Sequence, residues 1–472
     1  MKTPILGSSY TTRSVHAAAN RMVNLFPELI LEGGKDAAYL MRTPGLRLLV
    51  TAGTGPIRGL WAFGDYGYVV SGTTLYQIDN AWAATSRGTV LGTDPVSMAD
   101  NGTQLMVAAG THAYIYNAAT VAFSEITDPD FPGATTVGYL DGYFVFNEPD
   151  SQSIWVTSLF DGTAIDPLDF ASAEGFPDNL LAVVIDHREA WLFGTHSTEV
   201  WYNSGGADFP LERTQGAVLE VGTASSYCIA KLDNTLFWLA NDGIVYRANG
   251  YTQQRVSTHA VEQWISDNVD LSGARAYSYK QDGHAFLSLS FPDGDVTWFY
   301  DVATDRWHER AAWVNGAYER HQGVCHMVFN GEQVVGDRAN GKVYAFDSAV
   351  YSDAGEVQRW LRSWRVLPPG INRLKGEVHH SLQLDCEAGV GLLTGQGSTP
   401  EVMLRWSDDG GKTWSNELWR SMGAIGVTGT HVIWRRLGSS QKLRDRVYEV
   451  SGSDPVRIII TGAEVDVEPL DD

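Results

Sequence analysis

The chain of 472 residues is poor in cysteine, and its three cysteines, Cys228, Cys325 and Cys386, lie far apart. No two of them have the CxxC spacing of a zinc knuckle or redox motif, and an odd number cannot form a complete disulfide framework. The sequence therefore predicts folding in a reducing cytosol, without a cysteine metal site.

Long hydrophobic runs are missing as well. The segment that begins Met1-Lys2-Thr3-Pro4 lacks the apolar stretch of a secretory signal. The longest apolar run, Leu180–Ile185, is far shorter than the roughly 20 residues that cross a bilayer as a helix. We therefore expect a soluble protein that needs no membrane.

Basic residues are scarce relative to acidic ones, with 34 Lys and Arg against 56 Asp and Glu and a formal net charge of −22. Residues 353–472 hold 14 basic and 17 acidic residues, so residues 1–352 carry −19 of this charge. A body this acidic repels phosphate, which excludes a wide surface that grips nucleic acid. It leaves open a pore through which DNA slides without sticking, and also the simpler interpretation that acidity keeps the protein soluble.

Sustained helical periodicity is scarce, whereas short strands that end in an aromatic residue recur at nearly even intervals. The intervals of about 40 to 52 residues match one four-stranded propeller blade. Turns rich in Gly, Asn and Asp join β-branched and aromatic runs, as in stacked hairpins. The seven aromatic positions are Tyr76, Tyr116, Trp155, Trp201, Tyr246, Trp298 and Tyr344. We therefore predict an all-β protein with a β-propeller over residues 55–352, seven blades being favoured.

An insert at His259–Gly273 interrupts this repeat. It places Val261, Trp264 and Ile265 at helical spacing and so predicts one short helix. Because the insert is irregular, six blades plus an irregular unit remain a second interpretation.

The two ends of the chain differ from the repeat region. Residues 1–54 predict an extended N-terminal arm, because proline-containing turns flank the polar stretch Leu31–Asp36. Such an arm could close the propeller ring with a strand, or it could reach a neighbouring subunit. Residues 353–472 contain longer strands such as Val402–Trp406, separated by Gly and Pro, which predicts a small β-sandwich.

The sharpest local motif is an Asp-box, S-x-D-x-G-x-T-W, which occurs once and outside the blade region. Its fixed positions are Ser407, Asp409, Gly411, Thr413 and Trp414. We expect Asp409 to accept backbone N–H bonds, Gly411 to allow a positive φ and Trp414 to pack beneath the turn. The motif therefore predicts a stabilised hairpin turn rather than a catalytic group.

A basic cluster lies in the predicted sandwich, in contrast to the acidic body. Its members are Arg435, Arg436, Lys442, Arg444 and Arg446. One interpretation is a patch that docks on an acidic partner surface. The other is a set of charges on a solvated strand face.

No catalytic pattern rises above chance. Gly336–Lys342 has the spacing of a phosphate-binding loop, but Val343 follows where Ser or Thr is needed, and a strand follows where a helix is needed. HExxH and G-x-S-x-G motifs are missing. Carboxylate pairs for glycoside hydrolysis need only be close in space, so 56 acids are uninformative about them. The sequence predicts no catalytic residue, no metal and no cofactor.

Several segments together resemble the packaged-DNA stabilisation proteins, which are the tail hub or tail accessory factors of short-tailed bacteriophages. The C-terminal segments are Trp406–Trp414, His431–Ser440, Arg444–Val450 and Ser453–Arg457. The earlier ones are Val23–Leu25, Arg42–Leu46 and Trp191–Trp201. The resemblance spans nearly the whole chain.

This resemblance implies a non-enzymatic virion protein that assembles in the host cytoplasm. It implies a homo-hexameric ring beneath the head-completion adaptor on the portal. The ring would prolong the DNA channel, help retain packaged DNA and anchor the tail needle and tailspikes, with DNA passing through without sequence-specific binding. The alternative is a sialidase-like glycosidase or a glycan-binding propeller, suggested by the blades and the Asp-box, since one fold hosts many activities.

Overall fold

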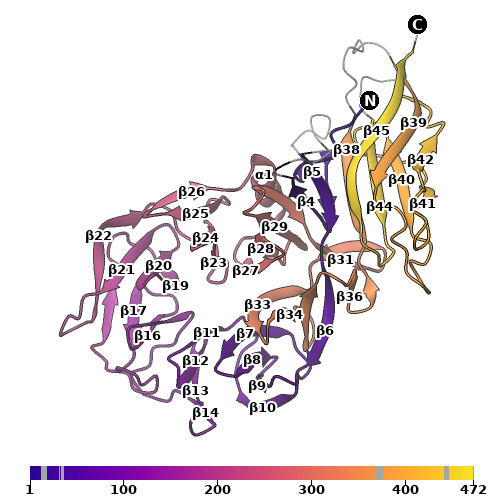
Figure 1. Ribbon diagram of the computed structural model, residues 1–472. Coiled ribbons are helices and arrows are strands. Elements are labelled where there is room, and N and C mark those ends of the chain that lie inside the picture. The colour runs from indigo at the N-terminus through magenta and orange to yellow at the C-terminus, as the bar shows by residue number, and fades with distance from the viewer. Residues whose placement is uncertain (12–18, 31, 33–36, 367–375, 441–445, 471–472) are drawn as a thin grey trace.

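A computed structural model describes residues 1–11, 19–30, 32, 37–366, 376–440 and 446–470. These residues form a propeller and a β-sandwich that lie side by side, with the N-terminal segment between them (Figure 1). The prediction of an all-β propeller followed by a β-sandwich is confirmed.

The propeller consists of antiparallel four-strand units in which each strand pairs with the next along the chain. The first unit contains β7 (Ile57–Phe63), β8 (Tyr66–Ser71), β9 (Thr74–Ile78) and β10 (Ala84–Thr89). The second contains β11 (Ser97–Asp100), β12 (Gln104–Ala109), β13 (His112–Asn117) and β14 (Ala122–Glu125). The third contains β15 (Val137–Leu140), β16 (Tyr143–Asn147), β17 (Ser153–Val156) and β18 (Phe170–Ser172). The next three are β19 (Leu180–Asp186), β20 (Glu189–Gly194), β21 (Thr198–Asn203) and β22 (Leu211–Leu219); β23 (Ile229–Leu232), β24 (Thr235–Leu239), β25 (Val245–Asn249) and β26 (Thr252–Arg255); and β27 (Arg275–Gln281), β28 (His284–Phe291), β29 (Val296–Asp301) and β30 (Arg306–Glu309).

The last unit closes the ring with a strand from the N-terminal segment. It contains β33 (Gly323–Phe329), β34 (Glu332–Asp337), β35 (Lys342–Asp347) and, as its fourth strand, β6 (Gly45–Thr51). β6 pairs antiparallel with β35 of the same chain, from Thr51 opposite Lys342 to Gly45 opposite Asp347. Of the two roles predicted for the arm, β6 therefore has the first, and the propeller begins before residue 55.

The seven aromatic positions that revealed the repeat share one structural place. Each lies on the third strand of a different four-strand unit: β9, β13, β17, β21, β25, β29 and β35. In these units the third strand lies between two others, so a paired strand flanks its aromatic residue on each side. Five of the seven are less than a tenth exposed, and Tyr76 and Tyr246 are half-buried. The spacing is therefore a consequence of core packing in each unit.

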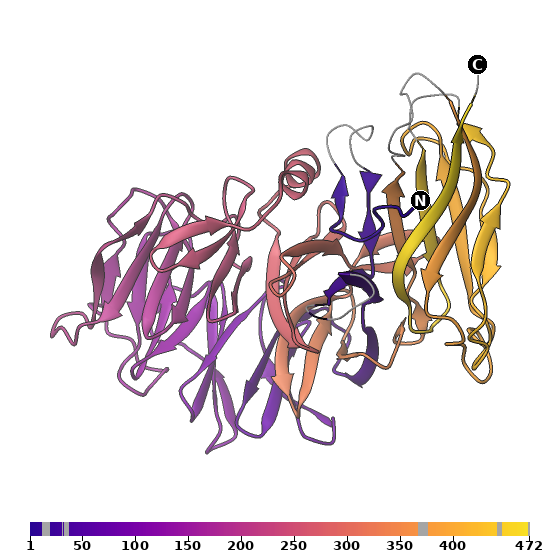
Figure 2. The same cartoon turned by 45° about the horizontal axis from the view of Figure 1, so that its top comes forward.

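The predicted short helix is also confirmed, as α1 (His259–Asn268). It lies between the β23–β26 and β27–β30 units and projects beside β4 and β5 (Figure 2). Val261 and Ile265 are fully buried against the core of these units. Trp264 packs edge-on against Phe291 and Trp298, with ring centroids 5.6 and 6.0 Å away.

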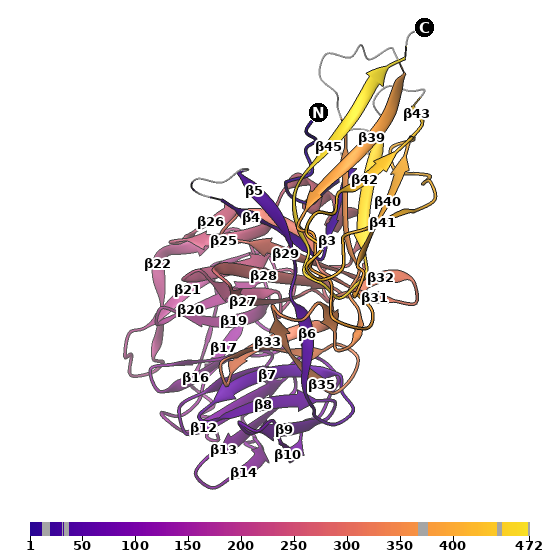
Figure 3. The ribbon, with the colours of Figure 1, turned by 45° about the vertical axis from the view of Figure 1, so that its right-hand side comes forward.

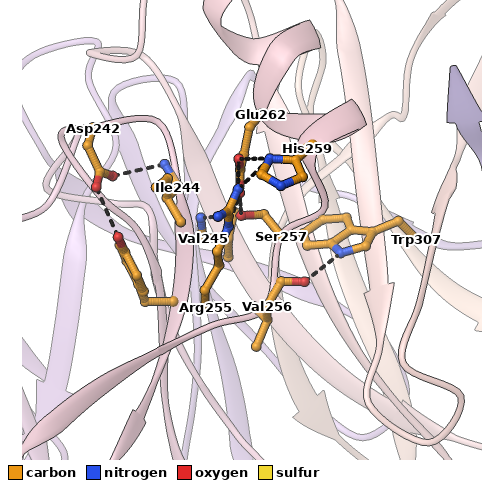
Figure 4. A network of polar contacts seen from close by, with 10 residues as sticks. Asp242, Ile244, Val245, Arg255, Val256, Ser257, His259, Glu262 and Trp307 are labelled. Carbon is orange, nitrogen blue, oxygen red and sulfur yellow. Dashed lines mark hydrogen bonds and ion pairs between the residues drawn. The ribbon is translucent and has the colours of Figure 1, made fainter. Parts of the chain in front are cut away.

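Polar contacts fix α1 to the strand that precedes it (Figure 4). Glu262 accepts hydrogen bonds from the Arg255 guanidinium and, at 2.6 Å, from Ser257 Oγ. Ser257 Oγ in turn accepts the Val245 N–H at 3.0 Å. The Trp307 indole N–H donates to the Val256 carbonyl at 3.0 Å and so links the helix segment to β30.

The sandwich packs two sheets face to face and stands beside the propeller (Figure 3). One contains β38 (Trp360–Arg365), β44 (Val447–Gly452), β40 (Glu401–Ser407) and β41 (Leu418–Ser421). The other contains β45 (Ile459–Pro469), β39 (Glu377–Cys386), β42 (Val432–Arg435) and β43 (Ser439–Ser440), extended by β5 (Ala38–Arg42) and β4 (Leu25–Leu29). Trp364, Trp434 and Tyr448 are fully buried between the sheets, together with Leu25 and Leu40 of the N-terminal segment.

A two-residue strand, β3 (Met22–Val23), joins the two domains. It pairs parallel with β30 of the propeller and antiparallel with β38 of the sandwich, so that nine strands form one sheet. The remaining short strands are β1 (Tyr10–Thr11), β2 (Ala19–Asn20), β31 (Ala311–Val314), β32 (Ala317–Arg320), β36 (Ser352–Asp353) and β37 (Glu356–Val357). The N-terminal segment is thus built into both domains rather than forming a separate arm.

Candidate interaction surfaces and the axial cavity

The Asp-box forms a tight turn between β40 and β41 of the sandwich. Asp409 accepts the backbone N–H groups of Lys412 and Thr413 at 2.8 and 2.9 Å, and the Thr413 hydroxyl at 2.7 Å. Ser407 Oγ donates to Asp409 at 2.6 Å and accepts the Gly411 N–H at 2.8 Å. These bonds, that from Ser407 first, hold the pKa of Asp409 well below its usual range. Gly411 has a φ of +102°, which favours glycine.

Trp414 lies differently from the expectation, because it is half-buried rather than enclosed beneath the turn. The Arg405 guanidinium lies over its ring at 4.6 Å, and Arg405 also pairs with Glu449 at 2.6 Å. The Asp-box therefore stabilises its turn mainly through hydrogen bonds, and the Trp414 indole adds a cation–π contact with Arg405.

Replacing Trp414 with alanine is expected to lower the free energy of unfolding by about 1–2 kcal/mol, because a half-buried ring loses part of its burial and one cation–π contact. Urea denaturation followed by circular dichroism measures this change. Trp419→Ala on the adjacent strand is the matched control, since its ring is 48% exposed. A loss for Trp414→Ala no larger than that of the control would refute this packing.

The basic cluster is divided by the structure. Arg435, at the end of β42, and Arg436, which follows it, are exposed, and within the described residues neither guanidinium has a hydrogen-bond or ion-pair partner. Lys442 and Arg444 lie outside the described residues. Arg435 and Arg436 thus remain candidates for docking on an acidic partner.

Arg446 does not belong to that surface, and its inclusion in a docking patch was wrong. Its side chain is 2% exposed and makes a two-pronged ion pair with Asp408, at 2.6 and 2.8 Å. It also donates to the Leu437 carbonyl at 2.7 Å, and its guanidinium lies over Trp406. Arg446 therefore anchors the Asp-box loop to the core of the sandwich.

Two arginines of the N-terminal segment, Arg21 and Arg42, make polar contacts that tie this segment to the rest of the protein. Arg21 makes a two-pronged ion pair with Glu309, at 2.9 and 3.1 Å. The Arg42 guanidinium donates to the carbonyl of Val456 at 3.0 Å, and also to the carbonyls of Asp454 and Gln358. No pattern in the sequence distinguishes these arginines from surface ones, because their acceptors lie hundreds of residues away.

A histidine clamp fixes β4 to the propeller. His284 is 5% exposed, with its Nδ1 2.8 Å from Asp301 and its Nε2 2.7 Å from Glu28. Burial alone would lower the pKa of His284, but the hydrogen bonds to these two carboxylates raise it to about 9. At neutral pH the imidazolium therefore bridges two acids from different segments.

The inner strands of the propeller surround an axial cavity of about 620 Å³. Tyr227, just before β23, crosses one end of it. The Tyr227 hydroxyl lies 2.9 Å from the Pro95 carbonyl and 3.2 Å from the Thr135 carbonyl, just before the inner strands β11 and β15 of two other units. The propeller axis is thus blocked where the inner strands begin, and it is no open pore.

The described residues contain no group of three or more His, Cys, Asp or Glu side chains that could hold a metal ion. Of the helical segments that the structure describes, none is long and apolar enough to span a membrane.

The described residues thus form an all-β protein in which a propeller and a β-sandwich are joined through shared strands. The model of the family described as "Bacteriophage P22 Gp10, beta-propeller" matches residues 1–351, and that described as "Bacteriophage P22 Gp10, beta-sandwich" matches residues 359–468. The chain belongs to this family, the tail hub and DNA stabilisation proteins of short-tailed phages, and the resemblance seen in its sequence is confirmed.

Among curated proteins, none matches the chain. Among solved structures, streptogramin B lyase is 10% identical over 69% of this chain and 98% of that chain, with a TM-score of 0.44. The Cps50 β-propeller domain of Myceliophteria thermophila is 10% identical over 63% of this chain and 98% of that chain, with a TM-score of 0.43.

Proposed function

We propose that this protein forms a homo-hexameric ring, the tail hub, beneath the head-completion adaptor that sits on the portal. The ring prolongs the DNA channel, helps retain packaged DNA and anchors the tail needle and tailspikes. It acts without catalysis and assembles in the host cytoplasm. The observation that carries this proposal is family membership over both domains, residues 1–351 and 359–468.

The blocked propeller axis bears on where the DNA passes. Tyr227 crosses that axis, and the cavity below it is too small for a duplex about 20 Å wide. In the proposed ring the channel therefore runs between subunits, past the outer surfaces of the protein. A charge of −19 over residues 1–352 suits this role, because an acidic wall lets phosphate slide without binding.

The sandwich offers the proposed docking surface for the adaptor. Arg435 and Arg436 are exposed and unpaired within the described residues, in a chain that is otherwise strongly acidic. Exposed cations of this kind steer an acidic partner and make the association sensitive to salt. The hydrogen-bonded Asp-box turn belongs to the same domain and gives it a fixed shape.

Light scattering of the protein, alone and mixed with the head-completion adaptor of its phage, tests this function. A species several times the 51.7 kDa chain mass is expected, at least in the mixture. Arg435→Glu combined with Arg436→Glu is expected to leave folding intact, weaken adaptor binding about tenfold and reduce its dependence on salt.

The matched control is Lys280→Glu combined with Arg306→Glu, which makes the same change in net charge on exposed propeller residues. A protein that stays monomeric in both samples would refute the hub. Equal adaptor binding by the wild type and the Arg435/Arg436 variant would show that these two arginines are solvated surface charges that take no part in docking.

A further inference from the structure

The axial cavity is a closed-ended chamber built by the whole propeller. Residues of all seven inner strands line it, and its volume of about 620 Å³ falls within the range of small-molecule sites. Much of its wall is apolar or aromatic, with Leu60, Trp61, Val137, Tyr139 and Ile229 among the lining residues. A chamber of this kind suits an organic ligand with an apolar body.

Two cations line this chamber without a polar partner. Arg275 is the first residue of β27, and Lys231 lies on the neighbouring inner strand β23. Within the described residues, neither side chain has a hydrogen-bond or ion-pair partner. Burial lowers the pKa of both groups. Arg275 is half-buried and Lys231 is exposed at the cavity wall, so each has N–H donors available to an anion in the cavity.

The strand register places the two cations at different depths. The Ala276 N–H donates to the Tyr227 carbonyl at 2.7 Å, so Arg275 lies at the end that Tyr227 crosses. The Ser278 hydroxyl donates to the Lys231 carbonyl, three residues further along β27. At about 3.3 Å per residue, the backbone positions from which the two side chains extend lie roughly 10 Å apart along the axis of the cavity.

The other charged groups of the lining are already engaged. Arg58 donates to four backbone carbonyls, those of Gly72, Val90, Leu91 and Asp94. Asp100, the acid of the lining, accepts the Trp61 indole N–H at 2.8 Å and the Gly102 N–H at 3.1 Å. Among the charged lining residues, the hydrogen-bonding groups without a partner are therefore those of the cations Lys231 and Arg275. They lie within residues 1–352, which carry a net charge of −19.

We propose that the axial cavity binds a small organic oxyanion, with its apolar body against the aromatic wall and its carboxylate or phosphate on Lys231 and Arg275. The site lies within one subunit and is independent of the ring. It is distinct from DNA binding, because the chamber admits no duplex. Tyr227 closes one end, so the ligand enters from the end nearer Lys231, which is exposed to solvent.

Calorimetric titration with phenyl phosphate, benzoate and the neutral benzyl alcohol tests the site and distinguishes phosphate from carboxylate. At least one anion is expected to bind the full-length wild type, and benzyl alcohol is expected not to bind. Lys231→Gln and Arg275→Gln are each expected to weaken the binding of that anion about tenfold, because each removes one charge-assisted contact.

Lys412→Gln is the matched control, because Lys412 is exposed on the Asp-box turn and its loss changes net charge equally. Arg275→Lys keeps the charge and is expected to retain most of the affinity, which separates loss of the contact from a folding defect. Binding of neither anion by the wild type overturns the proposal. Equal affinity in the wild type and both glutamine variants overturns it as well.

Discussion

Replacing Arg42 with leucine is expected to lower the free energy of unfolding by about 3–5 kcal/mol. The guanidinium is 1% exposed and donates to backbone carbonyls at Gln358, Asp454 and Val456. Leucine fills part of the space but donates nothing, so these carbonyls lose their partner, each at a cost of about 1–3 kcal/mol if it stays unsatisfied. Urea denaturation followed by tryptophan fluorescence and circular dichroism measures the loss.

Arg47→Leu is the control for this prediction. Arg47 pairs with Asp347 and Glu332 on β35 and β34, but its side chain is 41% exposed. Exposed pairs contribute at most about 1 kcal/mol, so this variant is expected to unfold close to the wild type. Equal losses for the two arginines would contradict the assignment of Arg42 as the buried joint between the N-terminal segment and the sandwich.

Acidification from pH 6.5 to 4.5 is expected to destabilise the protein by several kcal/mol, because it carries buried neutral histidines. Burial lowers the pKa of His321 to about 3, of His326 to about 4 and of His379 to about 3. A depressed histidine pKa gives stability that is present above the unfolded value of 6.5. That stability is lost as the pH falls toward the folded value.

Two groups act in the opposite direction. Burial raises the pKa of Asp353 to about 7, so its contribution is lost as the pH rises through 7 and is regained on acidification. His284, with its pKa raised to about 9, gives stability that is fully present below 6.5 and is lost as the pH rises through 9. Maximal stability is therefore expected near neutral pH, with the histidines dominating the acid limb.

His321→Asn isolates one of the histidines. His321 Nδ1 accepts the Gly323 N–H at 3.0 Å, and the amide oxygen of asparagine can take that place without titrating in this range. Free energies of unfolding from urea denaturation at pH 6.5, 5.5 and 4.5 are expected to fall less steeply for the variant, by about 1.4 kcal/mol per pH unit. Identical slopes for the two proteins would show that His321 is not held neutral.

The propeller could be read from the sequence because each four-strand unit repeats a local pattern. Aromatic residues such as Trp201 and Trp298 recur on the third strand of each unit, where they pack against its core. The hairpin turns between strands are indicated by short runs of Gly, Asn and Asp. The helix at His259–Asn268 was also predictable, since the apolar residues Val261 and Ile265 lie four positions apart, as on one face of a helix. Local signals of this kind survive without knowledge of the tertiary structure.

The joints and the sites depended on distant partners and could not be predicted. β3 consists of Met22 and Val23, and nothing in two residues shows that they will link a propeller to a sandwich. Arg446 immediately precedes β44, a strand buried along its whole length, so its basic neighbours in sequence said nothing about its burial. Tyr227, Lys231 and Arg275 meet around the axial cavity only because the ring closes.

The pairing of β6 with β35 also sets an order of events during synthesis. Gly45–Thr51 leaves the ribosome about 290 residues before Lys342–Asp347. At the usual rate of translation, this strand waits roughly 15–60 s with its edge unpaired. β4 and β5 wait longer, because β45 ends at Pro469. The propeller ring can therefore close only after Asp347 has been synthesised, and β5 can pair with β45 only after Ile460 has been synthesised.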